Sequence, residues 1–140
     1  MMRQPSYQAY KQQSVMTMTP AEMLTMLYDG ILKELYVVSK AFEKLPLDIA
    51  EINRGLQKTQ RILNYLKMSL DVNYDIAQNL FSLYDYCGRL LTQANIRKDP
   101  SGLEEVVEII SELKDTYIQA DKSVRMHVSD NERAIQTAPH

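Results

Sequence analysis

Apolar residues recur in a 4-3 alternation along four segments of this chain, and this is the spacing of helices that pack in a bundle. The row in the first segment reads Leu24, Tyr28, Ile31, Leu35, Val38, Phe42 and Leu45. The other three rows begin at Ile49, Ile76 and Leu103. No stretch alternates for long enough with the period of two that a strand requires. The pattern therefore predicts an all-α chain.

Helix start and stop signals bound these four segments. A capping residue is followed three positions later by Glu or Gln at each start: Thr19 with Glu22, Asp48 with Glu51, Asp75 with Gln78, and Ser101 with Glu104. Pro46 and Asp99-Pro100 end two of the segments. We expect helices at about 19–45, 48–71, 75–98 and 101–128. Because the loops between them are short, neighbouring helices should be antiparallel, which gives an up-down-up-down four-helix bundle.

The chain of 140 residues is long enough for one domain, and its composition divides it into three parts. Residues 19–130 form the expected bundle. Residues 1–18 have no sustained period but contain Tyr7 and Tyr10, so we expect an N-terminal segment that docks loosely on the rest of the chain. The polar residues 131–140 are expected to form a flexible tail.

The third helix has two neighbouring apolar rows. The first, at core spacing, reads Ile76, Leu80, Leu83, Cys87, Leu90 and Ala94, and the second reads Ala77, Phe81, Tyr84, Gly88, Leu91 and Asn95. Gly in a helix interior costs roughly 1 kcal/mol relative to Ala, so Gly88 suggests that another helix approaches closely. The second row is either part of a wide core stripe or a separate face for a partner.

Composition and charge argue against several classes of function. The net charge is −2 with no run of like charge, so neither nucleic acid nor an acidic membrane is an expected partner. No segment is apolar enough for a signal peptide or a membrane span, so we expect a cytosolic protein without membrane insertion. Cys87 is the single cysteine, which leaves no intramolecular disulfide, and it is interpreted as a small buried hydrophobe.

No catalytic, metal-binding or cofactor-binding pattern is present. A di-metal bundle site needs Glu-x-x-His pairs, and neither His127 nor His140 follows a Glu by three residues. No Gly-rich phosphate loop occurs. We therefore expect no enzyme activity, no metal and no cofactor, which leaves the binding of another protein segment, such as a helix, as the expected function.

Three motifs resemble those of the flagellar secretion chaperone family, FliS. Residues 6–15, SYQAYKQQSV, resemble the family's Y-x-x-Y-x-x-x-S-V opening. Residues 19–30, TPAEMLTMLYDG, resemble T-P-x-E-L-x-x-M-L-Y-x-G. Residues 83–86, LYDY, followed by Leu90 and residues 94–96, resemble L-Y-D-Y…L…A-N-I. The resemblance covers about residues 6–125.

The resemblance implies a cytosolic export chaperone that binds the C-terminal segment of flagellin, prevents its premature polymerisation and supports its secretion by the flagellar type III system. It implies contact with the flagellar export gate, and it places Tyr7 and Tyr10 in a lid over the flagellin site. From the helical faces we expect the groove itself to contain Tyr84, Gly88, Leu91 and Asn95, with Ile62 and Tyr65 opposite.

An alternative function uses the same groove for signalling. In that hypothesis the chain is a helical regulatory adaptor that binds another flagellar regulator or co-chaperone, such as an anti-sigma factor. Competition experiments would separate the two functions, because a regulator should either bind beside flagellin or be displaced by it in a defined order.

Overall fold

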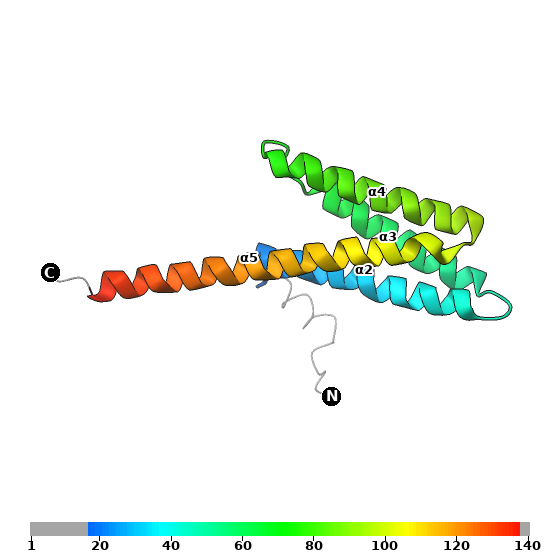
Figure 1. Cartoon of the computed structure of the whole chain (residues 1–140), viewed down its shortest axis with the longest axis horizontal. Coiled ribbons are helices and arrows are strands. Elements are labelled where there is room, and N and C mark those ends of the chain that lie inside the picture. The colour runs from blue at the N-terminus through cyan, green and yellow to red at the C-terminus, as the bar shows by residue number, and fades with distance from the viewer. Residues whose placement is uncertain (1–16, 138–140) are drawn as a thin grey trace, which may run out of the picture. The chain divides into compact units, whose positions relative to one another are not determined.

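A computed structural model gives the backbone of residues 17–137 and the side chains of residues 17–123 and of Met126. Four α-helices account for most of it: α2 (Pro20–Glu43), α3 (Ile49–Met68), α4 (Asp75–Arg97) and α5 (Leu103–Thr137), with the short 3-10 helix η1 (Pro100–Gly102) before α5 (Figure 1). The backbone of 17–137 contains no strand. The predicted all-α helical bundle is confirmed.

The chain divides into two compact units. One comprises Leu27–Leu113, and the other is formed by the residues on either side of it, up to Met26 and from Lys114 onward. The first unit contains most of α2, all of α3 and α4, and the start of α5. It is the unit in which the candidate functional site lies.

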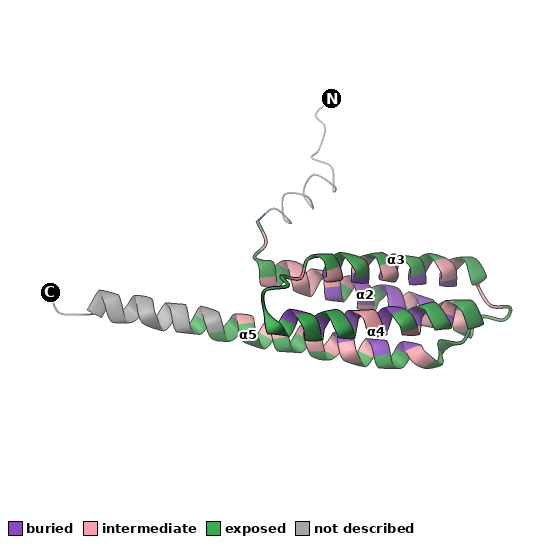
Figure 2. Ribbon diagram, turned by 90° about the horizontal axis from the view of Figure 1, so that it is seen from above, coloured by how far each residue is buried: buried purple, intermediate pink, exposed green. Residues whose placement is uncertain are grey.

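Within Leu27–Leu113 each helix is antiparallel to the next. Along α3 and α4, Asn53 contacts Lys98, Gln60 contacts Gly88, and Lys67 contacts Asp85, so residue numbers rise on one helix as they fall on the other. The same relation holds for α2 and α3, where Gly30 lies near Ile62 and Val38 lies near Gly55. It also holds where α4 meets η1 and α5, because Leu90 lies near Gly102 and Tyr86 donates to Glu105. Figure 2 shows the buried residues on the inward faces of these helices.

The core of this unit is mainly apolar, but it contains a buried pair of tyrosines and the buried polar residues Glu34 and Thr59. Its largest fully buried side chains come from all four helices: Tyr28, Tyr84, Ile31, Leu35, Ile52, Leu56, Leu63, Leu66, Leu91, Ile110, Val38 and Val106. The hydroxyl oxygens of Tyr28 and Tyr84 lie 2.6 Å apart in a hydrogen bond that joins α2 to α4. Buried hydroxyls need such partners, because an unsatisfied polar group in a core costs free energy.

Two of the four predicted helix starts are confirmed by their hydrogen bonds. Glu22 N–H donates to Thr19 Oγ1 at 3.1 Å, and Glu51 N–H donates to Asp48 Oδ1 at 3.2 Å. α4 begins at Asp75 as predicted, but the prediction that Asp75 is its N-cap is wrong, because Tyr74 is the N-cap and Asp75 is the first helical residue.

The start predicted at Ser101 is also wrong. Asp99 Oδ1 accepts the Ser101 N–H at 3.0 Å and so caps η1, and α5 begins only at Leu103. Pro100 occupies the first turn of η1, where its fixed φ is favourable, and the Asp99 carboxylate before it provides the cap.

The last helix is longer than predicted. It continues through Thr137, so residues 131–137, which were expected in the flexible tail, belong to α5. The sequence from 129 to 137 contains neither Gly nor Pro and therefore lacks the residues that most often end a helix. Polarity alone was a poor stop signal. The N-terminal segment 1–18 lies almost wholly outside the described residues, with Tyr7 and Tyr10 among those not described.

Glu34 is a buried carboxylate that joins α2 to α3. Its Oε2 lies 2.9 Å from Arg54 Nη2 and its Oε1 lies 3.0 Å from Lys58 Nζ. Desolvation by burial is the largest single influence and raises the pKa of Glu34. The hydrogen bonds and charges of Lys58 and Arg54 together outweigh it, so the pKa lies below its ordinary value of 4.5. The ion pairs therefore favour the charged carboxylate.

We expect acid to weaken the bundle through Glu34. A carboxyl with a lowered pKa in the folded state stabilises that state above its unfolded pKa, and this contribution is lost as the pH falls below about 4.5. Glu34→Gln should lower the free energy of unfolding by about 1 kcal/mol at pH 7, because both cationic partners are half exposed. The difference from wild type should shrink by pH 3 in urea titrations.

A matched control is Glu43→Gln on the same helix. Glu43 forms an exposed pair with Lys40, 3.5 Å away, so its removal should change stability little at either pH. An equal loss in both variants, or a loss from Glu34→Gln that does not depend on pH, would contradict the assignment.

Candidate functional site

The structure buries three residues that were expected to line an open groove. Tyr84, Gly88 and Leu91 all lie in the core of the bundle. In contrast, Ile76 and Leu83, which were expected in the core row, are exposed, Ile76 by 61%. Tyr84 and Gly88 therefore do not line an open groove in this structure, and the wide core stripe describes α4 better. The reason is that α4 packs against both α2 and α3, through Tyr84 and Gly88 respectively. The buried side of the helix is therefore centred on the second apolar row instead of the first. Contact of Tyr84, Gly88 and Leu91 with a partner stays a prediction.

Gly88 does mark a close approach, but to a helix of the same bundle. The side-chain amide of Gln60 on α3 donates to the carbonyl oxygen of Gly88 at 2.7 Å and to Thr92 Oγ1 at 2.9 Å. A Cβ atom on residue 88 would lie 3.2 Å from Gln60 Oε1, which is a tight contact. The glycine therefore lets α3 and α4 come together through this hydrogen bond.

The other expected groove residues do not share one face. Ile62 is partly buried on the side of α3 that faces α2, where its Cδ1 lies near Gly30. Asn95 is on α4 and hydrogen-bonds to Lys98. It lines a small depression of about 110 Å³ together with Leu91, so two of the predicted residues do meet there. Tyr65 is 55% exposed and points away from the core. The structure does not bring these residues together into a single groove.

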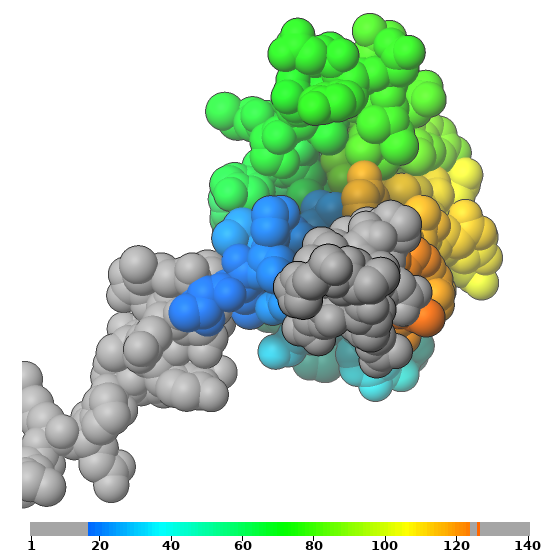
Figure 3. Space-filling view, turned by 90° about the vertical axis from the view of Figure 1, so that its left-hand side faces the viewer, coloured from blue at the N-terminus to red at the C-terminus, as the bar shows by residue number. Residues whose placement is uncertain are grey.

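An apolar groove lies instead between the end of α3 and the start of α4. Its volume is about 390 Å³. The residues that line it, here called the α3–α4 groove, are Lys67, Met68, Leu70, Val72, Ala77, Gln78, Phe81 and Ser82. Met68 is 87% exposed and Val72 is 82% exposed, although both are apolar. In Figure 3 the green side chains of this region lie on the surface that faces the viewer.

Lys67, the charged residue among those that line this groove, interacts with Asp85 and with the ring of Phe81. Lys67 Nζ lies 3.1 Å from Asp85 Oδ1 and 5.6 Å from the centroid of the Phe81 ring. Arg89 Nε approaches the other oxygen of Asp85 at 3.5 Å. Because Asp85 balances Lys67, the groove can receive an apolar side chain without leaving a cation unpaired.

Sequence reasoning missed this groove, although a signal was present. The residues between the second and third expected helices were treated only as a turn, yet they contain Val72 and Tyr74. Leu70 was assigned to the end of the second expected helix. Apolar residues in a solvent-facing turn are unusual enough to indicate a contact surface. Phe81 was assigned to the second row of α4, but its position beside α3 was not foreseen.

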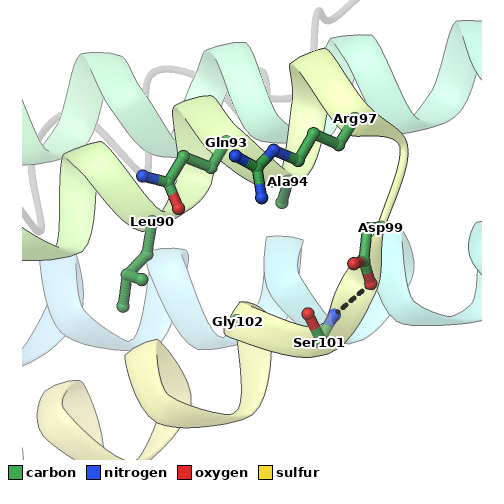
Figure 4. A pocket seen from close by; sticks show the side chains of 7 residues that line it. All are labelled: Leu90, Gln93, Ala94, Arg97, Asp99, Ser101 and Gly102. Atoms are coloured by element: carbon green, nitrogen blue, oxygen red, sulfur yellow. Dashed lines mark hydrogen bonds between the residues drawn. The ribbon is translucent and has the colours of Figure 1, made fainter.

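A second depression, of about 140 Å³, lies where α4 meets η1 (Figure 4). It is lined by Leu90, Gln93, Ala94, Arg97, Asp99, Ser101 and Gly102. The Asp99 carboxylate that borders it is already used to cap η1. This depression is thus small, and one of the polar groups that line it is already used in the hydrogen bond that caps η1.

The described residues offer little for covalent chemistry. Burial, together with the charge of Glu105, raises the pKa of the Cys87 thiol to about 11, so the thiol is protonated and unreactive at neutral pH. No group of three or more His, Cys, Asp or Glu side chains that could hold a metal was found in the described part of the chain. In the same part, no helix combines the length and apolar character required to cross a bilayer.

Comparison with known proteins gives consistent matches over most of the chain. The family model described as "Flagellar protein FliS" matches residues 2–124. "Flagellar secretion chaperone FliS" of Bacillus subtilis (strain 168) is 38% identical over 122 residues, covering 87% of this chain and 90% of that protein. The protein of the same name from Escherichia coli (strain K12) is 35% identical over 119 residues, covering 79% and 85%.

The fold is matched as well. A solved structure titled "Crystal structure of flagellar chaperone from bacteria" superposes with a TM-score of 0.69 and 24% identity, covering 84% of this chain and 95% of that one. At 24% identity this similarity supports the arrangement of the helices and nothing further.

Proposed function

This chain belongs to the FliS family of flagellar secretion chaperones, and on that premise we propose that it binds the C-terminal segment of flagellin in the cytosol. Binding would prevent premature polymerisation and support delivery to the flagellar export gate. The chain would act in this as a binding protein and not as an enzyme.

The observation that supports this proposal best is the α3–α4 groove. It exposes Met68, Val72 and Phe81 beside one another on a helical scaffold. Amphipathic helices bind in apolar grooves of this kind, and Met side chains adapt to the shape of what they contact. A disordered segment that folds on binding can cover a large surface at moderate affinity, which suits a chaperone that must release its cargo.

The partner-binding residues that were predicted from the sequence differ in how far the structure supports their part in this proposal. Tyr65 is exposed on the same helix as Met68 and is a candidate contact. Ile62 and Asn95 stay predictions, on separate faces. Tyr7 and Tyr10 lie outside the described residues, and we retain them as a proposed lid that competes with flagellin and so lowers its apparent affinity. The regulatory-adaptor alternative stays a prediction as well.

We expect Phe81→Ala to weaken the binding of a peptide that covers the C-terminal segment of the flagellin of the same organism. Phe81 is half exposed, so the substitution should leave the bundle folded while removing an aromatic anchor. Isothermal calorimetry should show a dissociation constant raised about tenfold, equivalent to about 1.4 kcal/mol. Wild type should gain helicity in circular dichroism when the peptide is added.

The matched control is Tyr36→Ala. Tyr36 is also aromatic and is 65% exposed, but it lies on α2 and does not line the α3–α4 groove. Its substitution should change the dissociation constant by less than about twofold. Equal losses in the two variants would refute the groove as the binding site, and absence of binding to wild type would refute the proposed cargo.

A further inference from the structure

We propose that part of the bound flagellin segment lies as one continuous helix along the whole line where α3 and α4 meet. This inference rests on the proposed function and deepens it, because it assigns a minimum length and a residue pattern to the bound helix. The surface in question, here called the α3–α4 seam, is formed by one row of side chains from each helix. The α3 row is Asn53, Gln57, Gln60, Asn64 and Lys67, and the α4 row is Phe81, Asp85, Gly88, Thr92 and Asn95.

The two rows of the seam face each other along their length. The helices are joined there by hydrogen bonds from Lys67 Nζ to Asp85 Oδ1 at 3.1 Å, from Gln60 Nε2 to Thr92 Oγ1 at 2.9 Å and from Lys98 Nζ to Asn53 Oδ1 at 2.7 Å. The ends of the α4 row are 14 residues apart, which is about 21 Å along a helix. The seam is therefore longer than the α3–α4 groove, which lies at one end of it.

Both ends of the seam open into a recess with an exposed apolar side chain. At one end the α3–α4 groove is lined by Lys67 and Phe81, and the Phe81 ring is 50% exposed. At the other end the depression of about 110 Å³ is lined by Gln57 and Asn95 and by Ile96, which is 78% exposed. Because members of the same two rows line both recesses, one ligand that follows the seam can reach both.

The spacing of the two rows favours a helix as that ligand. Both rows have the 4-3 alternation of helices that pack side by side, and two such rows form a groove for a third helix whose contacting residues repeat every 3.5 positions. An extended segment, with a period of two, would not keep the same register. To span about 21 Å, the bound helix needs at least about 14 residues, or four turns.

The middle of the seam is polar, and this determines which residues the bound helix can place there. Asn64 is exposed, and the half-exposed Asp85 carboxylate pairs with Lys67 on one oxygen and with Arg89 on the other. A large apolar side chain over these groups would remove them from water without supplying hydrogen bonds. The contacting row of the bound helix should therefore have large apolar residues at its two ends and Ser, Thr, Asn or Gln between them.

Isothermal calorimetry of the full-length chain with the flagellin peptide tests the extent of the site. Ile96→Ala removes the apolar side chain at the far end and should raise the dissociation constant at least about fivefold. Asn64→Trp places a bulky ring in the middle of the seam and should raise it at least about tenfold.

The matched control for the bulky ring is Asn79→Trp. Asn79 is also an exposed asparagine in a helix, but it belongs to neither row of the seam. This substitution should change the dissociation constant by less than about twofold. Circular dichroism of each free variant establishes that the fold is kept.

The length of the bound helix is measured separately. The circular dichroism of the wild-type complex, less the sum of its free components, should show a gain equal to at least about 14 helical residues. A gain of fewer than two turns would overturn the continuous helix.

The calorimetric outcomes separate this inference from the proposed function. If the peptide binds wild type and Phe81→Ala weakens it, but Ile96→Ala and Asn64→Trp do not, the seam is overturned and the chaperone proposal stands. Equal losses from Asn64→Trp and Asn79→Trp would also overturn the seam. A peptide that does not bind wild type would refute the proposed cargo, and this inference with it.

Discussion

Leu91→Ala should lower the free energy of unfolding by about 2–5 kcal/mol, as expected for a leucine whose side chain is removed from a packed core. Leu91 is fully buried on α4, together with Tyr84 and Cys87. The truncated side chain would leave a cavity, because neighbouring helices relax only in part. Urea denaturation followed by circular dichroism would measure the loss as a lower midpoint with an unchanged slope.

The same substitution distinguishes the two interpretations of the second apolar row. If Leu91 lined a partner groove, Leu91→Ala would leave stability nearly unchanged and abolish peptide binding. Tyr65→Ala provides the comparison, because Tyr65 is mostly exposed on α3. Its effect on stability should stay within about 0.5 kcal/mol. A Leu91→Ala variant with unchanged stability and no peptide binding would show that Leu91 belongs to a partner surface and not to the core.

The helices and their first two starts could be predicted because their signals are local. A Ser, Thr, Asp or Asn cap and a Glu three residues later are read within one turn, and the Thr19–Glu22 and Asp48–Glu51 bonds follow directly. The end of α5 was missed because the polar composition of residues 129–137 was taken as a stop signal, although they contain neither Gly nor Pro and the nearest proline is Pro139.

The orientation of α4 could not be obtained from its own sequence. Its two apolar rows lie side by side on the helix surface, and both have the right spacing. The choice depends on where α2 and α3 approach, which is fixed by contacts such as Tyr28 with Tyr84 and Gln60 with Gly88. These partners lie 56 and 28 residues apart in sequence, so no local pattern encodes them.

The candidate site was mispredicted for the same physical reason. A groove is formed by two elements, and its position follows from their packing. The α3–α4 groove combines the end of one helix, a turn and the start of the next, and its most exposed residues, Met68 and Val72, belong to different elements. The sequence supported only the general expectation that an apolar helix face binds another protein segment.

Gly55→Ala should also destabilise the bundle, by about 2 kcal/mol or more. A Cβ atom on residue 55 would lie 2.3 Å from Val38 Cγ2 on α2, so one of the two helices must move. The neighbouring Val38 is buried and β-branched, with one strongly preferred rotamer in a helix, and cannot turn aside easily. Overpacking of this kind costs typically 1–3 kcal/mol and sometimes more, and the severity of the overlap outweighs the roughly 1 kcal/mol that Ala gains in helix propensity.

Gly30→Ala is the matched control for this effect, since it makes the same change in the middle of α2. There the nearest atom to a new Cβ would be Ile62 Cδ1 at 3.5 Å, an ordinary contact with the end of a flexible side chain. Gly30→Ala should therefore raise stability by up to about 1 kcal/mol through helix propensity. Thermal and urea unfolding of the two variants should thus shift in opposite directions. Stabilisation by Gly55→Ala would mean that α2 and α3 are farther apart in solution than their contact at Val38 indicates.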